Sequence, residues 1–254
     1  MDIVIIGTGN VATVLGRKIL SAGHRILQVV GRDHQAANSL AILLNAEALN
    51  FDGDLSESAD IVIIAVNDNS IEAVAKELEL KNRFVVHTAG SVSKNILKRF
   101  TENYGVFYPL QSLRKEEIEL PVIPILYDGG NDIVVKKLRS LALSISPLHA
   151  LQADDDTRLK LHVAAVFVNN FSNHLYALAE DYSNKESINF KQLIPLITET
   201  ANRVNRHSPK DVQTGPAERD DLDTIEKHLA LLEKFPQMKN LYSILTESIM
   251  RSRK

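Results

Sequence analysis

The sequence predicts an α/β protein in which a doubly wound parallel sheet precedes an all-helical C-terminal part. Two observations predict the sheet. Short apolar runs alternate with helix-period stretches through the first 150 or so residues, and these runs are apolar throughout. Strands separated by helical patterns are typical of parallel sheets, and continuous apolar strands are typical of sheets covered on both faces. A third observation predicts the helical part, because no strand pattern follows Gln152.

The individual elements follow from the positions of these runs. Strands are expected at Ile3–Ile6, Ile26–Val30, Ala48–Phe51, Ile61–Val66, Phe84–His87, Val106–Tyr108, Val122–Leu126 and Leu148–Leu151. Helices are expected between them at Val11–Ala22, His34–Leu44, Ser70–Leu78, Lys94–Phe100 and Asp132–Leu143. Ala48–Phe51 is the weakest of the strand patterns, whereas Ile61–Val66 is a clear buried strand.

The helical part begins with an acidic stretch. Residues 154–157 are Asp-Asp-Asp-Thr, which offers helix N-caps and favourable charge at a helix start. Helices are expected from there to about Tyr182, then at Phe190–Arg206, Ala217–Phe235 and Gln237–Arg251. We therefore expect two domains, a nucleotide-binding domain over residues 1–152 and a helical substrate and dimerisation domain over residues 153–254.

Composition excludes several classes of protein. The 254 residues carry 29 Lys and Arg against 32 Asp and Glu, so no broad positive field for nucleic acid is expected. The absence of Cys excludes disulfides, thiolate metal sites and Cys nucleophiles, and we expect no metal. The chain has neither an apolar run of about 20 residues for a membrane helix nor the pattern of a signal peptide. We expect a cytoplasmic protein.

The strongest motif is the glycine-rich stretch Gly7-Thr8-Gly9-Asn10-Val11-Ala12, a G-x-G-x-x-A pattern. It ends a predicted strand and opens a predicted helix, the context of a dinucleotide-binding loop in a Rossmann fold. Gly7 allows the tight turn, Gly9 lets the backbone approach a pyrophosphate, and Ala12 keeps the helix close to the sheet. The helix N-terminus offers free N–H groups to the anion. The alternative is a glycine-rich turn without a ligand.

The residues after the second strand indicate which dinucleotide binds. An acidic residue about 20 positions beyond the loop would bind the ribose 2′-hydroxyl of NAD. The sequence there is Gly31-Arg32-Asp33, and an Arg can grip a 2′-phosphate with two N–H groups. We therefore expect NADP bound through Arg32. In the alternative, Arg32 is solvated and Asp33 takes the hydroxyl, which would give NAD.

Three further strand ends carry polar loops, and ligands bind at such ends in parallel sheets. After the strand that ends at Val66, Asn67 and the next residues line the cofactor or cap the next helix. After the following strand, Thr88 and Ser91 could hydrogen-bond a substrate carbonyl, and the alternative is again a cap by Ser91 or Ser93. Near Pro109, Tyr108 and Gln111 could face the substrate, or the segment is a rigid turn.

The long helix predicted after residue 154 carries a polar line. At about 100° per residue, His162, Asn169 and Asn173 lie nearly on one line with Asn170 beside it. The other face is apolar and is expected to pack in the core: Leu161, Ala164, Phe167, Val168, Phe171, Leu175 and Leu178. Amides and imidazoles suit a partly buried polar cleft, and the alternative is a solvated polar face. Because imidazole exchanges protons near neutral pH, His162 is expected to be the general acid, with Asn169 and Asn170 orienting the substrate and Asn173 beside them.

A second polar cluster covers residues 214–221, Thr-Gly-Pro-Ala-Glu-Arg-Asp-Asp. Pro216 at a first helical position and Glu218 near the third predict a helix start. Arg219 could bind a substrate carboxylate there, or Asp220 and Asp221 could neutralise it.

These motifs together resemble the 6-phosphogluconate-dehydrogenase-like reductases, a group that includes pyrroline-5-carboxylate reductase, ketopantoate reductase and the deazaflavin-dependent NADP reductases. The Gly7–Ala12 loop, residues 65–68 and the helical second half carry that resemblance. More narrowly, the sequence is similar to a bacterial family provisionally described as NADP oxidoreductases, with a Rossmann domain before a helical domain of unknown function. The segments that carry this likeness are residues 87–91, 109–112, 162–174 and 214–220. The resemblance implies a dimer-forming helical domain without an established substrate.

The sequence departs from these relatives in two places. The 3-hydroxyacid dehydrogenase relatives use a Lys followed four residues later by an Asn, whereas Lys160 is followed at that spacing by Ala164. Their Lys–Asn mechanism therefore does not carry over. In addition, Tyr108 stands where a His is expected before the Pro-Leu-Gln stretch.

The sequence thus predicts an NADP-dependent oxidoreductase that moves hydride to or from a small carbonyl, hydroxy or imine compound, assembled as a homodimer through apolar residues of the C-terminal helices. One alternative is hydride transfer between NADP and a deazaflavin, which needs no proton-donating His. Another is a dinucleotide-binding sensor or scaffold without turnover. A methyltransferase that binds S-adenosylmethionine fits Arg32 and the helical part less well.

Overall fold

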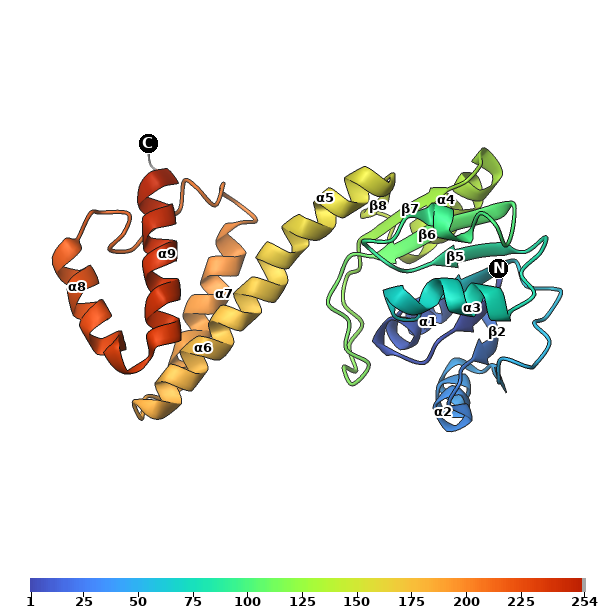
Figure 1. Ribbon diagram of the computed structural model, residues 1–254, viewed down its shortest axis with the longest axis horizontal. Coiled ribbons are helices and arrows are strands. Elements are labelled where there is room, and N and C mark those ends of the chain that lie inside the picture. The colour runs from blue at the N-terminus through green and yellow to red at the C-terminus, as the bar shows by residue number, and fades with distance from the viewer. Residues whose placement is uncertain (253–254) are drawn as a thin grey trace. The chain divides into compact units, whose positions relative to one another are not determined.

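A computed structural model describes residues 1–252; Arg253 and Lys254, the last two residues of the predicted second domain, lie outside the described residues. Within the described part, eight strands form one sheet in the order β3-β2-β1-β4-β5-β6-β7-β8 (Figure 1). Their bounds are β1 Asp2–Ile6, β2 Arg25–Val30, β3 Glu47–Leu49, β4 Ile61–Ile64, β5 Phe84–His87, β6 Asn103–Pro109, β7 Ile125–Gly129 and β8 Ala150–Gln152. The predicted α/β class with a Rossmann-type sheet is confirmed.

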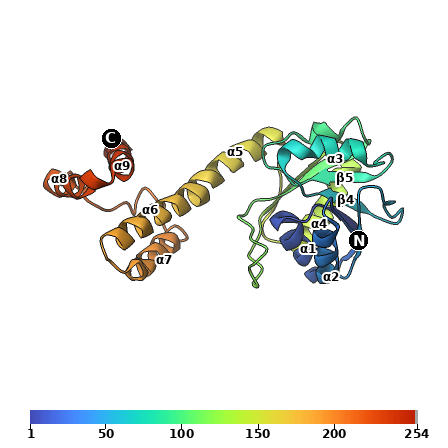
Figure 2. The same cartoon turned by 60° about the horizontal axis from the view of Figure 1, so that its bottom comes forward.

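Helices cover both faces of this sheet. They are α1 (Asn10–Ser21), α2 (His34–Leu44), α3 (Ile71–Glu77) and α4 (Asp132–Ile145). Figure 2 shows α3 on one side of the sheet and α1, α2 and α4 on the other. Each face has its own apolar cluster, one joining the sheet to α1, α2 and α4 and the other joining it to α3. This arrangement explains why β4, Ile-Val-Ile-Ile, is buried along its whole length.

The sheet is not parallel throughout. β7 runs antiparallel to β6, with Phe107 opposite Tyr127, while the other neighbouring pairs in the described sheet are parallel. Parallel neighbours need a crossover connection, usually a helix. Residues 110–124 form no helix and return directly, with Leu110 N–H donating to Pro124 O at 2.8 Å. The expected strand Val122–Leu126 accordingly begins later, at Ile125.

The helix expected at Lys94–Phe100 is a short 3-10 helix, Lys94–Leu97. The N–H groups of Lys98 and Phe100 bond to carbonyls three residues back, at Asn95 and Leu97. This tighter spacing rarely continues beyond one turn. The segment is therefore a connector between β5 and β6 rather than a crossover helix.

The C-terminal part is helical, as predicted. A continuous helical stretch contains α5 (Asp155–Ala165), a π-helical segment (Val166–Phe171) and α6 (Ser172–Lys185). It is followed by α7 (Ile194–Arg203), α8 (Leu222–Leu231) and α9 (Pro236–Ser252). The chain divides into two compact units, Met1–Asn170 and Phe171–Lys254, so the division falls within the π-helical segment. The boundary at residue 152 stays a prediction for the functional domains.

The helix start expected at Pro216 and Glu218 is wrong. Residues 216–219 form a turn in which Arg219 N–H donates to Pro216 O. Asp220 then adopts a left-handed φ of 54°, which interrupts any helix there. The N-cap of α8 is Asp221, whose carboxylate accepts from Thr224 N–H at 3.1 Å.

The second unit buries few of its apolar side chains. Among described residues 171–252, the buried positions are Ser183, Ala217, Ile225 and Leu232. Most of the predicted core stripe of the long helix is exposed instead, with Val168 at 76% and Leu175 at 39% exposed, while Leu161 and Leu178 are half-buried. The expectation of a core stripe is wrong for these residues, because neither they nor Phe167 and Phe171 are buried.

Candidate functional site

The glycine-rich loop joins β1 to α1 in the geometry that the motif predicts. Gly7 has a φ of +118°, and a Cβ at this position would lie 2.2 Å from the carbonyl oxygen of Ala65 at the end of β4. Only glycine allows this close approach between two strand ends. Gly9 is the N-cap of α1, and a Cβ there would meet nothing within 4 Å. Ala12 is fully buried, which brings α1 against the sheet.

The N-terminus of α1 is suited to an anion. Its N-cap makes no side-chain hydrogen bond, and its first turn has no acidic residue. The backbone N–H groups of that turn therefore keep their partial positive charge for a ligand. We conclude that the residues present fit the pyrophosphate of a dinucleotide.

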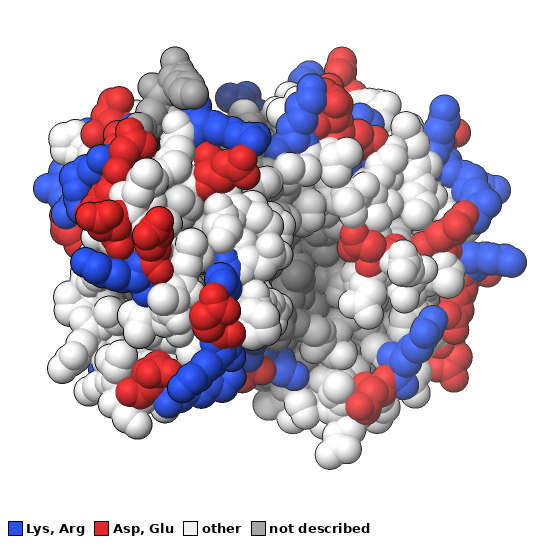
Figure 3. Space-filling view, turned by 60° about the vertical axis from the view of Figure 1, so that its left-hand side comes forward, with Lys and Arg blue, Asp and Glu red and all other residues white. Residues whose placement is uncertain are grey.

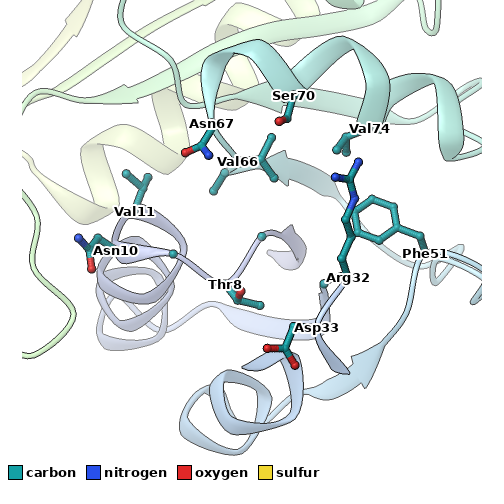
Figure 4. Close-up of a pocket in the computed structure, with 14 residues that line it drawn as sticks. Thr8, Asn10, Val11, Arg32, Asp33, Phe51, Val66, Asn67, Ser70 and Val74 are labelled. Atoms are coloured by element: carbon teal, nitrogen blue, oxygen red, sulfur yellow. The ribbon is translucent and has the colours of Figure 1, made fainter. Parts of the chain in front are cut away.

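This loop forms one wall of a cavity of about 510 Å³ at the carboxyl ends of β1, β2 and β4 (Figure 4). Its size lies in the usual range of small-molecule sites. The cavity lies at the point where the strand order reverses between β1 and β4, where such sheets bind ligands. Its lining residues are Gly7, Thr8, Gly9, Asn10, Val11, Gly31, Arg32, Asp33, Phe51, Ala65, Val66, Asn67, Ser70 and Val74.

Arg32 and Asp33 differ in what they already contact. The Arg32 guanidinium lies 5.8 Å from the centroid of the Phe51 ring, and Figure 4 shows it extending between Phe51 and Val74. Its Nη2 is 3.9 Å from Glu77 Oε2, and its side chain is 67% exposed. Asp33 instead caps α2, because its Oδ1 accepts from the N–H groups of Gln35 at 2.9 Å and Ala36 at 3.2 Å.

The loop after β4 faces the cavity rather than capping the next helix. Asn67 and Ser70 both line the cavity, and neither side chain makes a cap hydrogen bond. Asp68 turns to the neighbouring loop, where its Oδ2 accepts from Ser91 Oγ at 2.8 Å. Asn67 thus lines the cavity without capping through its side chain, and its contact with a cofactor stays a prediction.

The loop after β5 is tied into the protein. Thr88 is buried, and its hydroxyl is 3.5 Å from the carbonyl oxygen of Ile64. Ser91 donates to Asp68, and Ser93 is the residue that caps the following 3-10 helix, accepting from Asn95 N–H. Gln111 in the next loop spans to Val122 O at 3.1 Å and accepts from Ser112 N–H. Thr88, Ser91 and Gln111 therefore have protein partners, and their substrate roles stay predictions.

Tyr108 and His162 meet at the carboxyl ends of β5 and β6. Tyr108 Oη is 2.9 Å from His162 Nδ1, and the two rings stack edge to face with centroids 5.9 Å apart. Gly90 lies beneath them, since a Cβ there would be 2.8 Å from Tyr108 Cζ and 3.0 Å from His162 Nδ1. The sequence singled out both side chains, but not that they bond to each other across 54 residues of chain.

The Asn residues of the long helix follow a different path from the predicted one. Asn169 and Asn170 lie in the π-helical segment, where each turn contains more residues than in an α-helix. The line through His162, Asn169 and Asn173 assumed 100° per residue, so it does not hold across this segment. Asn173 lies in the first turn of α6, and Arg219 lies in the turn before α8, with Nη2 4.0 Å from Asp221 Oδ2. Their roles toward a substrate stay predictions.

Two buried ionisable residues beside the loop after β5, Arg158 and His87, were not among the candidate site residues of the sequence analysis. Arg158 is 1% exposed, although it is the largest of the fully buried side chains in residues 1–252. His87 is fully buried, and burial together with the nearby Arg158 charge lowers its pKa to about 4. Arg158 stands four residues before His162, the spacing of neighbours on one helix face, which is the signal that could have identified it.

Residues 1–252 contain neither a metal-binding cluster nor a membrane-spanning helix. No cluster of three or more His, Asp or Glu side chains there could hold a metal ion. None of the helices in that range is both long and apolar enough to span a bilayer. On the face that Figure 3 shows, the basic and acidic side chains of the described residues are interspersed.

The fold and the loop define a Rossmann-type dinucleotide-binding protein. Residues 2–91 match the family described as "NADP oxidoreductase coenzyme F420-dependent". Residues 123–249, half of the chain, match the domain of unknown function DUF2520. The chain belongs to the family that carries this domain behind an oxidoreductase-type Rossmann domain, as the sequence resemblance implied.

Solved structures agree with this assignment. A Bacteroides fragilis protein provisionally described as an NADP oxidoreductase is 35% identical, with 98% of each chain covered and a TM-score of 0.88. A Thermotoga maritima protein is 22% identical over 99% of each chain, with a TM-score of 0.75. The 1-pyrroline-5-carboxylate reductase of Streptococcus pyogenes is 16% identical, covers 99% of this chain and 98% of its own, and has a TM-score of 0.65. The last two show the fold alone.

One curated relative also matches. The glutamyl-tRNA reductase of Methanococcus aeolicus is 25% identical over 153 residues, 55% of this chain. The match spans only 39% of that enzyme's length.

Proposed function

We propose that the protein is an NADP-dependent oxidoreductase that moves hydride to or from a small carbonyl, hydroxy or imine compound. The observation that carries the proposal is the cradle formed by Gly7–Val11 together with Arg32 at one end of the same cavity. The cofactor, when bound, supplies the hydride chemistry. The chain's own residues would hold the dinucleotide, orient the substrate and move a proton.

Arg32 supports NADP rather than NAD. Its guanidinium is exposed, and its ion pair with Glu77 is long at 3.9 Å, so it can turn to a 2′-phosphate at small cost. One oxygen of the Asp33 carboxylate, Oδ1, is already engaged at the start of α2. An acidic residue occupied as an N-cap is less available to the ribose 2′-hydroxyl that NAD would present.

His162 is our candidate for the proton donor. It is half-buried beside the end of β5, and β5 is the strand next to β4, whose end lines the cavity. Asn169 and Asn170 follow on the same helical stretch and would orient the substrate. Further candidates for contact with the substrate are Thr88, Ser91, Gln111, Asn173 and Arg219.

We further propose that residues 153–254 form a substrate and dimerisation domain, and that the protein works in the cytoplasm as a homodimer. The exposed apolar side chains of the helices support this assembly, among them Leu196 at 64% and Leu231 at 62% exposed. Apolar surface on this scale normally marks an interface.

The test is a parallel titration with NADPH and NADH. The chain has no Trp, so the nicotinamide emission itself reports binding. We expect NADPH to bind more tightly than NADH, and Arg32→Ala to lose that preference. Arg99→Ala is the matched control, because Arg99 is also an exposed Arg over a Phe ring, at 4.8 Å from Phe100, but lies outside the cavity. Equal binding of both nucleotides would assign NAD, and binding of neither would overturn the oxidoreductase proposal.

A second candidate is hydride transfer between NADP and a deazaflavin. It is favoured by the description of the family that matches residues 2–91. That match ends before Tyr108 and His162, so it does not reach the proposed reacting end of the site. Turnover that survives in His162→Ala would favour the deazaflavin reaction over proton-coupled reduction of a carbonyl or imine.

A further inference from the structure

The proposed function gives no role to Tyr108, which stands at the end of a strand where the resemblance leads one to expect a His. Tyr108 lies on β6, is half-buried, and directs its hydroxyl to Nδ1 of His162 at 2.9 Å. In the described residues, this is the only hydrogen bond of the Tyr108 hydroxyl, and His162 Nε2 makes none. The pair therefore reserves one ring nitrogen of His162 and leaves the other for a ligand.

Burial raises the pKa of Tyr108, so its hydroxyl keeps its proton, with the Asp68 charge acting in the same sense and Arg158 opposing it more weakly. A protonated hydroxyl and a neutral imidazole can each donate or accept. Donation by Tyr108 is the arrangement that gives the hydroxyl proton an acceptor, because His162 Nδ1 is its one partner among the described residues. A neutral imidazole has one donor and one acceptor nitrogen. When Tyr108 donates to Nδ1, the ring proton must lie on Nε2. When the ring is charged, the same hydroxyl oxygen can accept from Nδ1–H, so the bond holds the ring in both states.

The backbone beneath the pair is held by Arg158. Its Nε donates to Gly90 O at 3.2 Å, and its Nη2 donates to Val92 O and, at 2.8 Å, to Asp155 Oδ1. Asp155 also accepts from Lys94 N–H at 3.2 Å. Arg158 precedes His162 by one helical turn, so these bonds fix the start of α5 against the loop that contacts the His162 ring. Because the buried Arg158 side chain bonds to both the loop and the helix, the first turn of α5 has a well-defined position against the loop.

We propose that Tyr108 is a positioning residue that fixes the tautomer and direction of the His162 ring, so that Nε2–H is presented to the substrate. Gly90 and Arg158 support this arrangement. Gly90 leaves room for the two rings because it has no side chain, and Arg158 donates to the Gly90 carbonyl. The catalytic consequence rests on the proposed function of His162, whereas the tautomer and ring direction do not.

The test reads the His162 ring directly by nitrogen NMR of protein labelled at its histidines. The chain has eight His residues, and His162→Gln identifies the relevant signals. At a pH where the ring is neutral, we expect an acceptor-type signal for Nδ1 and an N–H signal for Nε2. In Tyr108→Phe, both should move toward averaged values. Tyr104→Phe is the matched control, because Tyr104 lies on the same strand but bonds to Asn95.

A wild-type ring that carries its proton on Nδ1 would overturn the proposal, and so would unchanged ring signals in Tyr108→Phe. The wild-type measurement decides the matter even if the variant does not fold. Once a substrate is in hand, Tyr108→Phe should lower kcat about tenfold with little change in KM, the loss expected for one hydrogen bond. If the ring signals behave as expected but His162→Ala keeps full turnover, the proposed role of His162 fails while the positioning by Tyr108 stands.

Discussion

The two compact units of the chain solve the problem of burial differently. In Met1–Asn170, both faces of the sheet carry apolar clusters, and strands such as β4 are buried along their whole length. In the described part of the second unit, four residues are buried, and one of them is Ser183. The sheet unit thus contains its own core, while the helical unit presents apolar side chains on its surface.

This difference teaches where the stability of each unit comes from. Burying apolar area is the main favourable contribution to folding, and a unit with so little of it needs another surface to cover its helices. A second copy of the chain is the occupant that the proposed homodimer supplies. The comparison therefore predicts that equivalent substitutions have different consequences in the two units.

The largest effect is expected at an exposed leucine of α7. Leu196→Glu should weaken dimerisation at least 100-fold, because a carboxylate would have to be buried without a partner. Sedimentation equilibrium at micromolar concentration measures this. Leu148→Glu is the matched control in the sheet unit, since Leu148 is 87% exposed, and it should leave the mass unchanged. A wild-type protein that sediments as a monomer would break the comparison.

A smaller effect is expected from truncation inside the sheet. Ile63 on β4 is fully buried, so Ile63→Ala should lower the free energy of unfolding by about 2–5 kcal/mol. Ile244 on α9 is 54% exposed, and Ile244→Ala should cost less than about 1 kcal/mol in the monomer. Urea denaturation compares the two variants. Equal losses would contradict a core confined to the sheet unit.

The buried His87 gives the sheet unit a characteristic pH dependence. Its pKa is about 4 in the folded protein against an ordinary value of 6.5, because burial and the Arg158 charge disfavour the charged ring. The unfolded chain therefore takes up this proton first as the pH falls. Stability should be complete above pH 6.5 and should decline by about 3 kcal/mol as the pH falls to 4. Unfolding curves across that range measure the decline.

Two variants isolate the contribution of His87. His87→Gln should flatten the curve between pH 6.5 and 4, because the amide does not titrate. His149→Gln, at an exposed position, should leave the curve as in the wild type. If the slope persists in His87→Gln, other groups carry it.

The smallest effect is expected at the cap of α2. Asp33→Ala should cost about 1 kcal/mol of stability, as loss of an N-cap does. It should leave the preference for NADPH intact, because Arg32 is proposed to set that preference. Thermal unfolding and the nucleotide titration together measure both outcomes. A variant that lost nucleotide discrimination would transfer the role to Asp33.

Most of the fold could be predicted because it is encoded locally. The strands are recognisable as apolar runs in the sequence. The strand Phe84–His87 and the helix His34–Leu44 have the bounds that the pattern predicts. The direction of β7 could not be predicted, because it depends on how residues 110–124 return. The apolar stripe after Lys160 was correctly identified as apolar, but the pattern alone does not say which surface covers it.

The candidate site also has a part that follows from local sequence and a part that depends on tertiary packing. The Gly7–Ala12 loop and Arg32 are adjacent to strand ends in the sequence, so their geometry follows from local rules. The bond between Tyr108 and His162 and the bond from Arg158 to Gly90 join residues 54 and 68 positions apart. Such contacts depend on the packed tertiary structure, and a single sequence does not contain a direct signal for them.

The π-helical segment Val166–Phe171 has a consequence for how the length of this chain can change. The division between the two units falls inside a helix and not in a loop. Deleting one residue there would turn the side chains of α6 by about 100° about the helix axis relative to those of α5 and shorten the helix by about 1.5 Å. An insertion or deletion in the turn-rich stretch between α7 and α8 would be absorbed locally. We therefore expect related chains to vary in length in the loops and to conserve the residue count of this helical stretch.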